Sequence, residues 1–209
     1  MNYINSSTIT DINVIPILHE CSSFFLEDNE INFIRNGTKY DGTAVHRKNQ
    51  LSKNKNILEN ENLSRVKNFI NDRMLNYIEN VVQIENEFYM TQSWSTISKK
   101  NQNHHVHTHP NAIFSCVYYA QCESGDIEFY FEPRLREKFN FTYKIKKWNN
   151  FNCETWNYEV KTGDLIVFPA WIPHGTTPND IETDRIVIGA NYFIKGKVGE
   201  YDDTDLIEI

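Results

Sequence analysis

The stretch GDLIVFPAWIPHGTTPN, residues 163–179, joins a short apolar run to a single histidine. A Gly-Asp turn opens the run, Pro-Ala-Trp closes it, and His174 follows after two more residues. Short apolar runs bounded by turn residues are typical of strands buried in a β-core. The stretch therefore predicts a strand that delivers a histidine to one end of such a core.

The neighbouring segments from residue 88 onward also have the two-residue period of β-strands. In GDIEFYFEP, for example, Ile127 and Phe129 alternate with Asp126 and Glu128. Several short strands without helical spacers indicate a β-sandwich or barrel rather than a parallel α/β sheet. The predicted strands are FYMTQSWSTIS (88–98), IFSCVYYA (113–120), GDIEFYFEP (125–133), FTYKIKKW (141–148), GDLIVFPAW (163–171) and RIVIGANYFI (185–194).

Residues 1–87 are polar, rich in Asn and helical where they are periodic. Apolar residues recur at three- and four-residue spacing over 62–85, which predicts a long amphipathic helix with one packing face. A weaker helix is expected over 22–36, and 37–56 is expected to be a linker. We predict one domain, with a helical region at 1–87 packed on a β-core at 88–200, and an acidic tail at 201–209.

Composition excludes several classes of protein. The net charge of the 209 residues is −7, which argues against a nucleic-acid-binding surface. No apolar run approaches ~18 residues and the first ten lack a basic segment, so we expect neither a membrane protein nor a secreted precursor. The four cysteines have no CxxC spacing, which predicts a reduced, cytoplasmic protein.

Four of the seven histidines lie within six positions of NHHVHTHPNAIFSCVYYA, residues 103–120. Residues at i and i+2 of an extended chain share a face, so His105, His107 and His109 point the same way. Together with His174 they predict a mononuclear metal site, although a histidine-rich loop without metal is the alternative. Arg185 opens the next strand, where it is placed to bind a carboxylate or else to pair with a neighbouring acidic residue.

These segments resemble the 2-oxoglutarate- and iron(II)-dependent oxygenases, within a prolyl-hydroxylase-like branch of bacterial and phage members. The resemblance implies a mainly β fold, a double-stranded β-helix (jelly roll) of eight core strands with N-terminal helices packed on one sheet. It also implies iron(II) as cofactor and 2-oxoglutarate as co-substrate. It covers about residues 88–194 through SW (93–94), HTHPNAIFSCVYYA (107–120), GDIEFYFEPR (125–134), GDLIVFPAWIPHGTTPN (163–179) and RIVIGANYF (185–193).

The resemblance assigns roles to particular residues. His107 matches the first metal ligand, His174 the distal histidine, and Arg185 the residue that binds the C5 carboxylate of 2-oxoglutarate. Tyr119 matches a residue that hydrogen-bonds the same carboxylate. Asn191 shares its side-chain direction with Arg185, so it either lines the same pocket or faces solvent. No catalytic residue is expected beyond the metal centre.

The third metal ligand departs from the superfamily pattern. Relatives carry a carboxylate two residues after the first histidine, where this chain has His109. We expect His109 to be the ligand because it occupies that position and precedes Pro110, which keeps the chain extended. The alternatives are His105, which shares its direction, and Glu128 on a neighbouring strand.

The implied activity is a hydroxylase that couples decarboxylation of 2-oxoglutarate to succinate with C–H oxidation by dioxygen. The expected primary substrate is a peptidyl side chain or a small molecule, because the acidic charge argues against a nucleic acid and the prolyl-hydroxylase resemblance favours a protein or amino acid. No membrane partner is expected. Two alternatives keep the fold. One is a three-histidine cupin-type metalloenzyme without 2-oxoglutarate, which does not need Arg185. The other is a non-catalytic metal-binding or accessory protein.

Overall fold

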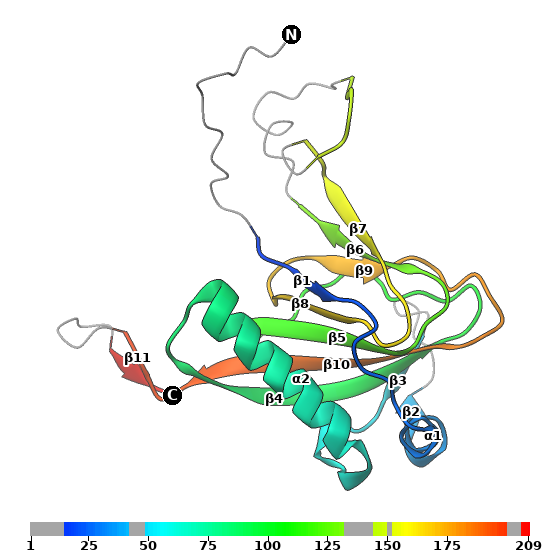
Figure 1. The fold of residues 1–209 in the computed structure, drawn as a ribbon, viewed down its shortest axis with the longest axis horizontal. Coiled ribbons are helices and arrows are strands. Elements are labelled where there is room, and N and C mark those ends of the chain that lie inside the picture. The colour runs from blue at the N-terminus through cyan, green and yellow to red at the C-terminus, as the bar shows by residue number, and fades with distance from the viewer. Residues whose placement is uncertain (1–14, 42–48, 132–143, 150–151, 200–205) are drawn as a thin grey trace.

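The computed structural model describes residues 15–41, 49–131, 144–149, 152–199 and 206–209 (Figure 1). Helical segments are few and short: α1 (Asp28–Asn32), η1 (Phe33–Gly37), η2 (Ile57–Glu59), η3 (Glu61–Leu63), α2 (Ser64–Tyr77) and η4 (Ile78–Val82). The strands are β1 (Leu18–Glu20), β2 (Tyr40–Asp41), β3 (Gln50–Ser52), β4 (Glu87–Ser98), β5 (Phe114–Gln121), β6 (Asp126–Tyr130), β7 (Thr155–Glu159), β8 (Leu165–Pro169), β9 (His174–Thr176), β10 (Arg185–Lys195), β11 (Lys197–Val198) and β12 (Ile207–Glu208).

The strands form two facing layers and a small hairpin. The main sheet has the order β1-β8-β5-β10-β4-β3-β2, and the minor sheet has the order β7-β6-β9. Their strand pairs are antiparallel. An isolated antiparallel bridge pairs His107 with His174 on β9, so the segment at His107 lies beside β9 as a fourth member of the minor sheet. Four strands (β8, β5, β10, β4) thus face four (β7, β6, β9 and the His107 segment), which confirms the predicted jelly roll.

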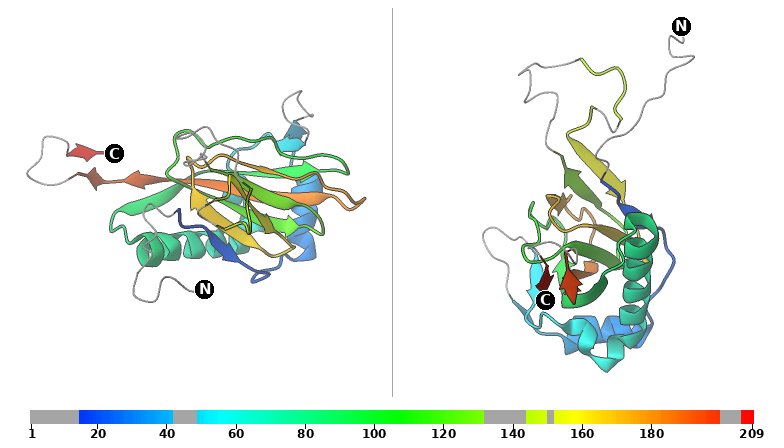
Figure 2. Two further views of the ribbon diagram at one scale, coloured as in Figure 1. Left: turned by 90° about the horizontal axis from the view of Figure 1, so that it is seen from above. Right: turned by 90° about the vertical axis from the view of Figure 1, so that its left-hand side faces the viewer.

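Helix α2 covers the outer face of the main sheet (Figures 1 and 2). Its residues Val66, Ile70, Met74 and Tyr77 are fully buried in one apolar cluster with β5, β8 and β10. A second cluster, which includes Phe129 and Phe168, lies between the two sheets. None of the helices in the described ranges is long and apolar enough to span a membrane.

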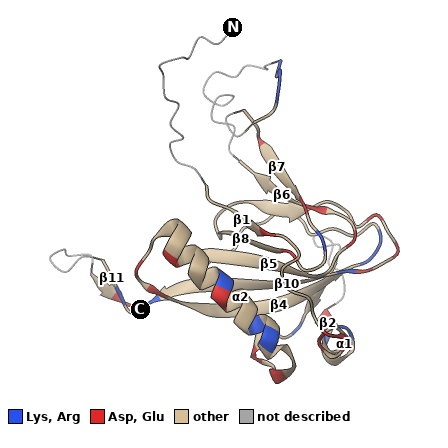
Figure 3. Cartoon of the chain, viewed as in Figure 1, with Lys and Arg blue, Asp and Glu red and all other residues tan. Residues whose placement is uncertain are grey.

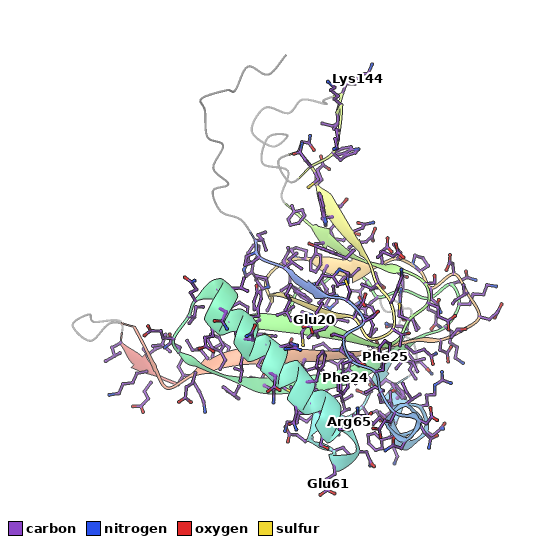
Figure 4. All side chains as sticks on the ribbon, viewed as in Figure 1. Glu20, Phe24, Phe25, Glu61, Arg65 and Lys144 are labelled. Atoms are coloured by element: carbon purple, nitrogen blue, oxygen red, sulfur yellow. The ribbon has the colours of Figure 1, made fainter. Side chains whose placement is uncertain are left out.

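The ends of α2 are fixed by neighbouring side chains and by backbone conformation. Arg65 lies 5.1 Å from the ring centre of Phe24 and pairs with the buried Glu30 at 2.7 Å, so the first turn is tied to α1 and the segment before it (Figure 4). The helical path ends where Gln83 adopts a left-handed conformation (φ 60°). Charged residues gather on the helices and loops and are sparse on β5, β8 and β10 (Figure 3).

The helix predicted over 62–85 and most predicted strands are present, with four differences. The predicted helix 22–36 begins only at Asp28, because Ser22 (φ 43°) gives its N–H to Asp164 Oδ1 at 2.6 Å and leads an extended segment. The predicted strand 141–148 is absent from residues 144–149, while 141–143 lie outside the described residues. Strand β7 was not predicted, since four of its five residues are exposed.

The fourth difference is that residues 1–87 also supply strands, because β1, β2 and β3 extend the main sheet at its two edges. These strands have only two or three residues each, too few for a periodic pattern. The expected acidic tail lies partly outside the described residues, and its end forms β12, which pairs with β11.

Shortening Ile70 should show how much the α2 interface contributes to stability. Ile70 is fully buried, so Ile70→Ala is expected to lower the free energy of unfolding by about 2–5 kcal/mol, measured by urea denaturation. Leu75 on the same helix is 45% exposed, and Leu75→Ala should cost less than about 1 kcal/mol. Equal losses in the two variants would contradict the assignment of the packing face.

Candidate metal centre and carboxylate pocket

Three histidine side chains meet between the two sheets. Nitrogen atoms of His107, His109 and His174 all lie within 4.8 Å of one another, the only such cluster of His, Cys, Asp or Glu found in the described part of the chain. Two backbone bonds align the first and last, because His107 N donates to His174 O (2.9 Å) and His174 N donates to His107 O (3.0 Å). His109 is held by its own N–H, which donates to Ala170 O at 2.9 Å.

Backbone carbonyls fix which imidazole nitrogen is free. His107 Nδ1 lies 2.9 Å from His105 O, and His174 Nδ1 lies 3.0 Å from Ile172 O. A carbonyl oxygen only accepts, so both rings carry their proton on Nδ1 and present the Nε2 lone pair to the centre. His174 Nε2 is 3.1 Å from His109 Nε2.

Burial keeps these rings neutral. It lowers the pKa of His107, and with the neighbouring His107 it lowers the pKa of His109 to about 3. The pKa of His174 is also well below its usual value, mainly because the ring is buried. Neutral imidazole is the form that binds a metal ion, so the cluster is in its ligating state at neutral pH.

The histidine nitrogens are close enough to bind one metal ion. Two imidazole ligands with bonds of about 2.0–2.1 Å lie roughly 3.0–3.4 Å apart around one ion, and His109 Nε2 and His174 Nε2 are 3.1 Å apart. Three histidines on one side of an ion leave the remaining positions open for other molecules.

Aromatic side chains hold the histidine rings in place. Trp94 stacks on His109 at 5.4 Å between ring centres, and Phe168 lies 4.5 Å from the His174 ring centre. Trp94 lies directly over Gly189 on β10, where an added Cβ would come within 2.5 Å of the indole. Gly189 is therefore needed for this placement of Trp94.

A buried cation lies at the other end of the same pocket. Arg185 is 4% exposed, and its Nη2 donates to Thr176 Oγ1 and Thr177 O, both at 2.9 Å. No carboxylate lies within ion-pair distance of it among the described residues, although Asp126 is near enough for the Arg185 charge to oppose the rise in its pKa. A buried guanidinium without a counter-ion favours an anionic ligand, because an unpaired buried charge is costly.

Tyr119 provides a second donor beside Arg185. Its hydroxyl is buried and has no hydrogen-bond partner in the described part of the structure. Burial raises its pKa, so the group remains an O–H donor. Arg185 and Tyr119 together fit a carboxylate.

One pocket, the inner pocket, connects the two ends. It places the histidine cluster and the Arg185–Tyr119 pair in the same space, separated by mainly apolar walls. The inner pocket is lined by Asn49, Trp94, Thr96, Ser98, His104, His107, His109, Val117, Tyr119, Ile127, His174, Gly175, Thr176, Arg185, Val187 and Gly189.

The structure brings together five of the six predicted site residues. Asn191 does not line the inner pocket, and its Oδ1 instead accepts a hydrogen bond from Ser115. The alternative ligand Glu128 lies outside the histidine cluster, where its carboxylate accepts from Tyr130. His105 is also outside the cluster, and its carbonyl orients His107.

Two contributors, Gly125 and Thr176, were not predicted. Thr176 binds Arg185 through its hydroxyl, and a Cβ on Gly125 would lie 2.0 Å from Arg185 Nη1. The Gly-Asp sequence at 125–126 indicated a turn, and Gly125 has a positive φ of +93°. Nothing in the sequence indicated that Arg185 would approach Gly125 closely.

A known protein family matches the part of the chain that contains this site. Residues 92–191 match the family described as "Putative 2OG-Fe(II) oxygenase", and the matched range contains all three histidines, Tyr119 and Arg185. Over residues 92–191 the chain is similar to the 2-oxoglutarate- and iron(II)-dependent oxygenase superfamily. The cofactors of this superfamily, iron(II) and 2-oxoglutarate, are the pair predicted from the sequence.

Solved structures share the fold of this chain at low sequence identity. A prolyl-4-hydroxylase from Pseudomonas putida aligns with a TM-score of 0.57 and 12% identity over 86% of this chain and 93% of that one. HygX from Streptomyces hygroscopicus, solved with nickel, 2-oxoglutarate and hygromycin B, gives 0.57 and 13% over 84% and 82%. The viral collagen prolyl hydroxylase of Paramecium bursaria Chlorella virus-1 gives 0.53 and 11% over 84% and 94%. No curated protein matches the sequence.

Proposed function

We propose that this oxygenase is a hydroxylase that binds iron(II) at His107, His109 and His174 and anchors 2-oxoglutarate at Arg185 and Tyr119. The reaction consumes 2-oxoglutarate, dioxygen and a C–H bond, and yields succinate, carbon dioxide and the hydroxylated product. The observation that carries the proposal is the buried Arg185, which has no carboxylate partner in the described structure and shares one pocket with the three histidines.

The protein residues would contribute binding, orientation and exclusion of water. Iron(II) with 2-oxoglutarate supplies the chemistry that activates dioxygen. Arg185 and Tyr119 would hold the distal carboxylate, so that the co-substrate can adopt only one orientation along the inner pocket. Val117, Ile127 and Val187 form apolar walls, which keep bulk water from competing at the metal.

The primary substrate would be a peptidyl side chain or a small molecule. The similar structures include two prolyl hydroxylases and HygX with hygromycin B bound, but at 11–13% identity they support only the shared fold. The cytoplasmic location stays a prediction from cysteine usage.

Anaerobic titration tests the proposed function. Addition of iron(II) and then 2-oxoglutarate to the apoprotein should produce a weak visible charge-transfer band only when both are present. Exposure to oxygen should then release succinate even without the primary substrate. Tight zinc binding with no band in the presence of iron(II) would instead favour the metal-binding protein.

Gly125 should affect co-substrate binding through Arg185. In Gly125→Ala the new Cβ must displace the guanidinium, so we expect at least about tenfold weaker 2-oxoglutarate binding by titration of the charge-transfer band. Gly196 provides a matched control, because it has a similar φ of +85° but no atom within 4 Å of an added Cβ. Gly196→Ala should lose some stability and keep its affinity for 2-oxoglutarate. Equal affinities in the two variants would contradict this role of Gly125.

A further inference from the structure

The inner face of the main sheet carries a second polar group beyond the metal centre, formed by Gln92, Ser115 and Asn191 and named here the amide row. Asn191 on β10 pairs in register with Gln92 on β4 and with Ser115 on β5. Ser115 Oγ donates to Asn191 Oδ1 at 2.6 Å. Asn191 Nδ2 then makes only a long bond of 3.4 Å to Gln92 Oε1.

The position of the amide row follows from strand alternation. Arg185, Val187 and Gly189 line the inner pocket at every second position of β10, so Asn191 is the next residue on that face. The Trp94 indole lies over Gly189 and stacks on the metal ligand His109, so Gly189 lies beside the metal centre. Asn191 is two residues further along the strand, a distance of about 7 Å. The amide row therefore begins about one such step past the metal centre, on the side away from Arg185.

The neighbouring strand also places the row near the metal ligands. Phe168 on β8 pairs with Ser115, and its ring centre is 4.5 Å from that of His174. If 2-oxoglutarate occupies the space between the histidines and Arg185, another substrate must reach the metal from the other side. The amide row lies along that side.

The side chains of the amide row are uncharged, and each can donate and accept hydrogen bonds. Ser115 is fully buried, Asn191 is 5% exposed and Gln92 is exposed, so the row leads from the interior to the surface. Because Ser115 fixes Asn191 Oδ1, the amide hydrogens of Nδ2 face Gln92 with unused capacity. Among the described residues that line the inner pocket, Arg185 is the only Lys, Arg, Asp or Glu.

We propose that Asn191 and Gln92 bind an uncharged amide or hydroxyl group of the primary substrate, next to the carbon that is oxidised. Ser115 acts as a positioning residue through Asn191. Such a neutral group both donates and accepts hydrogen bonds, which matches the two carboxamides, whereas a charged group finds no counter-ion in the row. This inference rests on the proposed function and narrows its substrate to a class.

Paramagnetic relaxation of small probes tests the inference without the natural substrate. Protein loaded with manganese(II) and saturated with 2-oxoglutarate is mixed with acetamide, acetate or methylammonium, and the relaxation of the methyl protons is measured by NMR. Acetamide should be relaxed most strongly in the parent protein. Asn191→Leu should weaken the apparent affinity for acetamide roughly tenfold, the effect of losing one net hydrogen bond.

Several variants make the result specific. Asn157→Leu is the matched control, because Asn157 lies exposed on β7 outside the inner pocket and should leave acetamide binding unchanged. Ser115→Ala should lower the affinity for acetamide less than Asn191→Leu does. The variant keeps the Asn191 carboxamide and removes only the hydroxyl that orients it. Gln92→Leu alters an exposed side chain, so it remains informative if Asn191→Leu does not fold.

The outcomes separate this inference from the proposed function. Equal relaxation of all three probes, or parent-like acetamide binding in both Leu variants of the row, would overturn the inference. Weaker 2-oxoglutarate binding in Asn191→Leu with unchanged acetamide binding would assign Asn191 to the co-substrate instead. Failure of the parent metalloprotein to relax the methylene protons of 2-oxoglutarate would reject the proposed function, and the inference with it.

Discussion

Arg185→Ala is expected to weaken 2-oxoglutarate binding by about 2–5 kcal/mol, roughly 30-fold to several-thousand-fold, while iron(II) binding stays nearly intact. The reason is that the carboxylate would enter a buried site in which Arg185 is the only Lys or Arg among the described lining residues. Titration of the charge-transfer band with 2-oxoglutarate measures the first effect, and metal competition against a chelator measures the second.

Two further variants define what Arg185 contributes. Arg185→Lys keeps the charge but loses the planar pair of donors, so its affinity should fall between those of the parent and Arg185→Ala. Arg73 pairs with Glu20 at 2.9 Å on the outer surface, and Arg73→Ala should bind 2-oxoglutarate like the parent. Equal affinity in Arg185→Ala and the parent would favour the three-histidine cupin enzyme, which needs no such anchor.

The strands and the histidine cluster could be predicted because each depends on local patterns. The alternation in β6 marks its inner face, and the i, i+2 spacing of His107 and His109 places both rings on one side of an extended segment. The pairing of His107 with His174 does not follow from a local pattern, since 67 positions of chain separate them. It was expected because a jelly roll brings strand ends together, and the resemblance assigned both residues as ligands.

Other features depended on contacts that a local pattern does not contain. The Asn191 side chain points to the same face of the sheet as Arg185, as alternation along the strand predicts. Alternation alone does not tell whether Asn191 lies near Arg185 or beyond the metal centre. Its bond to Ser115 and its register with Gln92 place it beyond the metal centre, away from Arg185. Likewise, β1 was missed because the bonds from Ser22 and His19 to Asp164 that hold it come from a turn far along the chain.

The positive charges of a bound metal ion and of Arg185 should make metal binding depend on 2-oxoglutarate. The three histidines are neutral ligands, so a divalent ion beside the buried Arg185 would bring three positive charges into a pocket that no carboxylate of the described residues lines. 2-Oxoglutarate carries two negative charges and offsets most of this repulsion. Metal and co-substrate should therefore bind cooperatively, each raising the affinity for the other by the same factor.

His109→Asp should weaken this cooperativity. An aspartate would supply a negative charge at the metal, so we expect the metal to bind at least about tenfold more tightly without 2-oxoglutarate, and the enhancement by 2-oxoglutarate to shrink. Manganese(II) dissociation constants, measured with and without 2-oxoglutarate, provide both quantities and do not depend on turnover. His109→Ala should lose metal, whereas His105→Ala should retain it, because His105 lies outside the cluster. Loss of metal in His105→Ala together with retention in His109→Ala would show that the third ligand is His105, and the charge argument would then apply to that position.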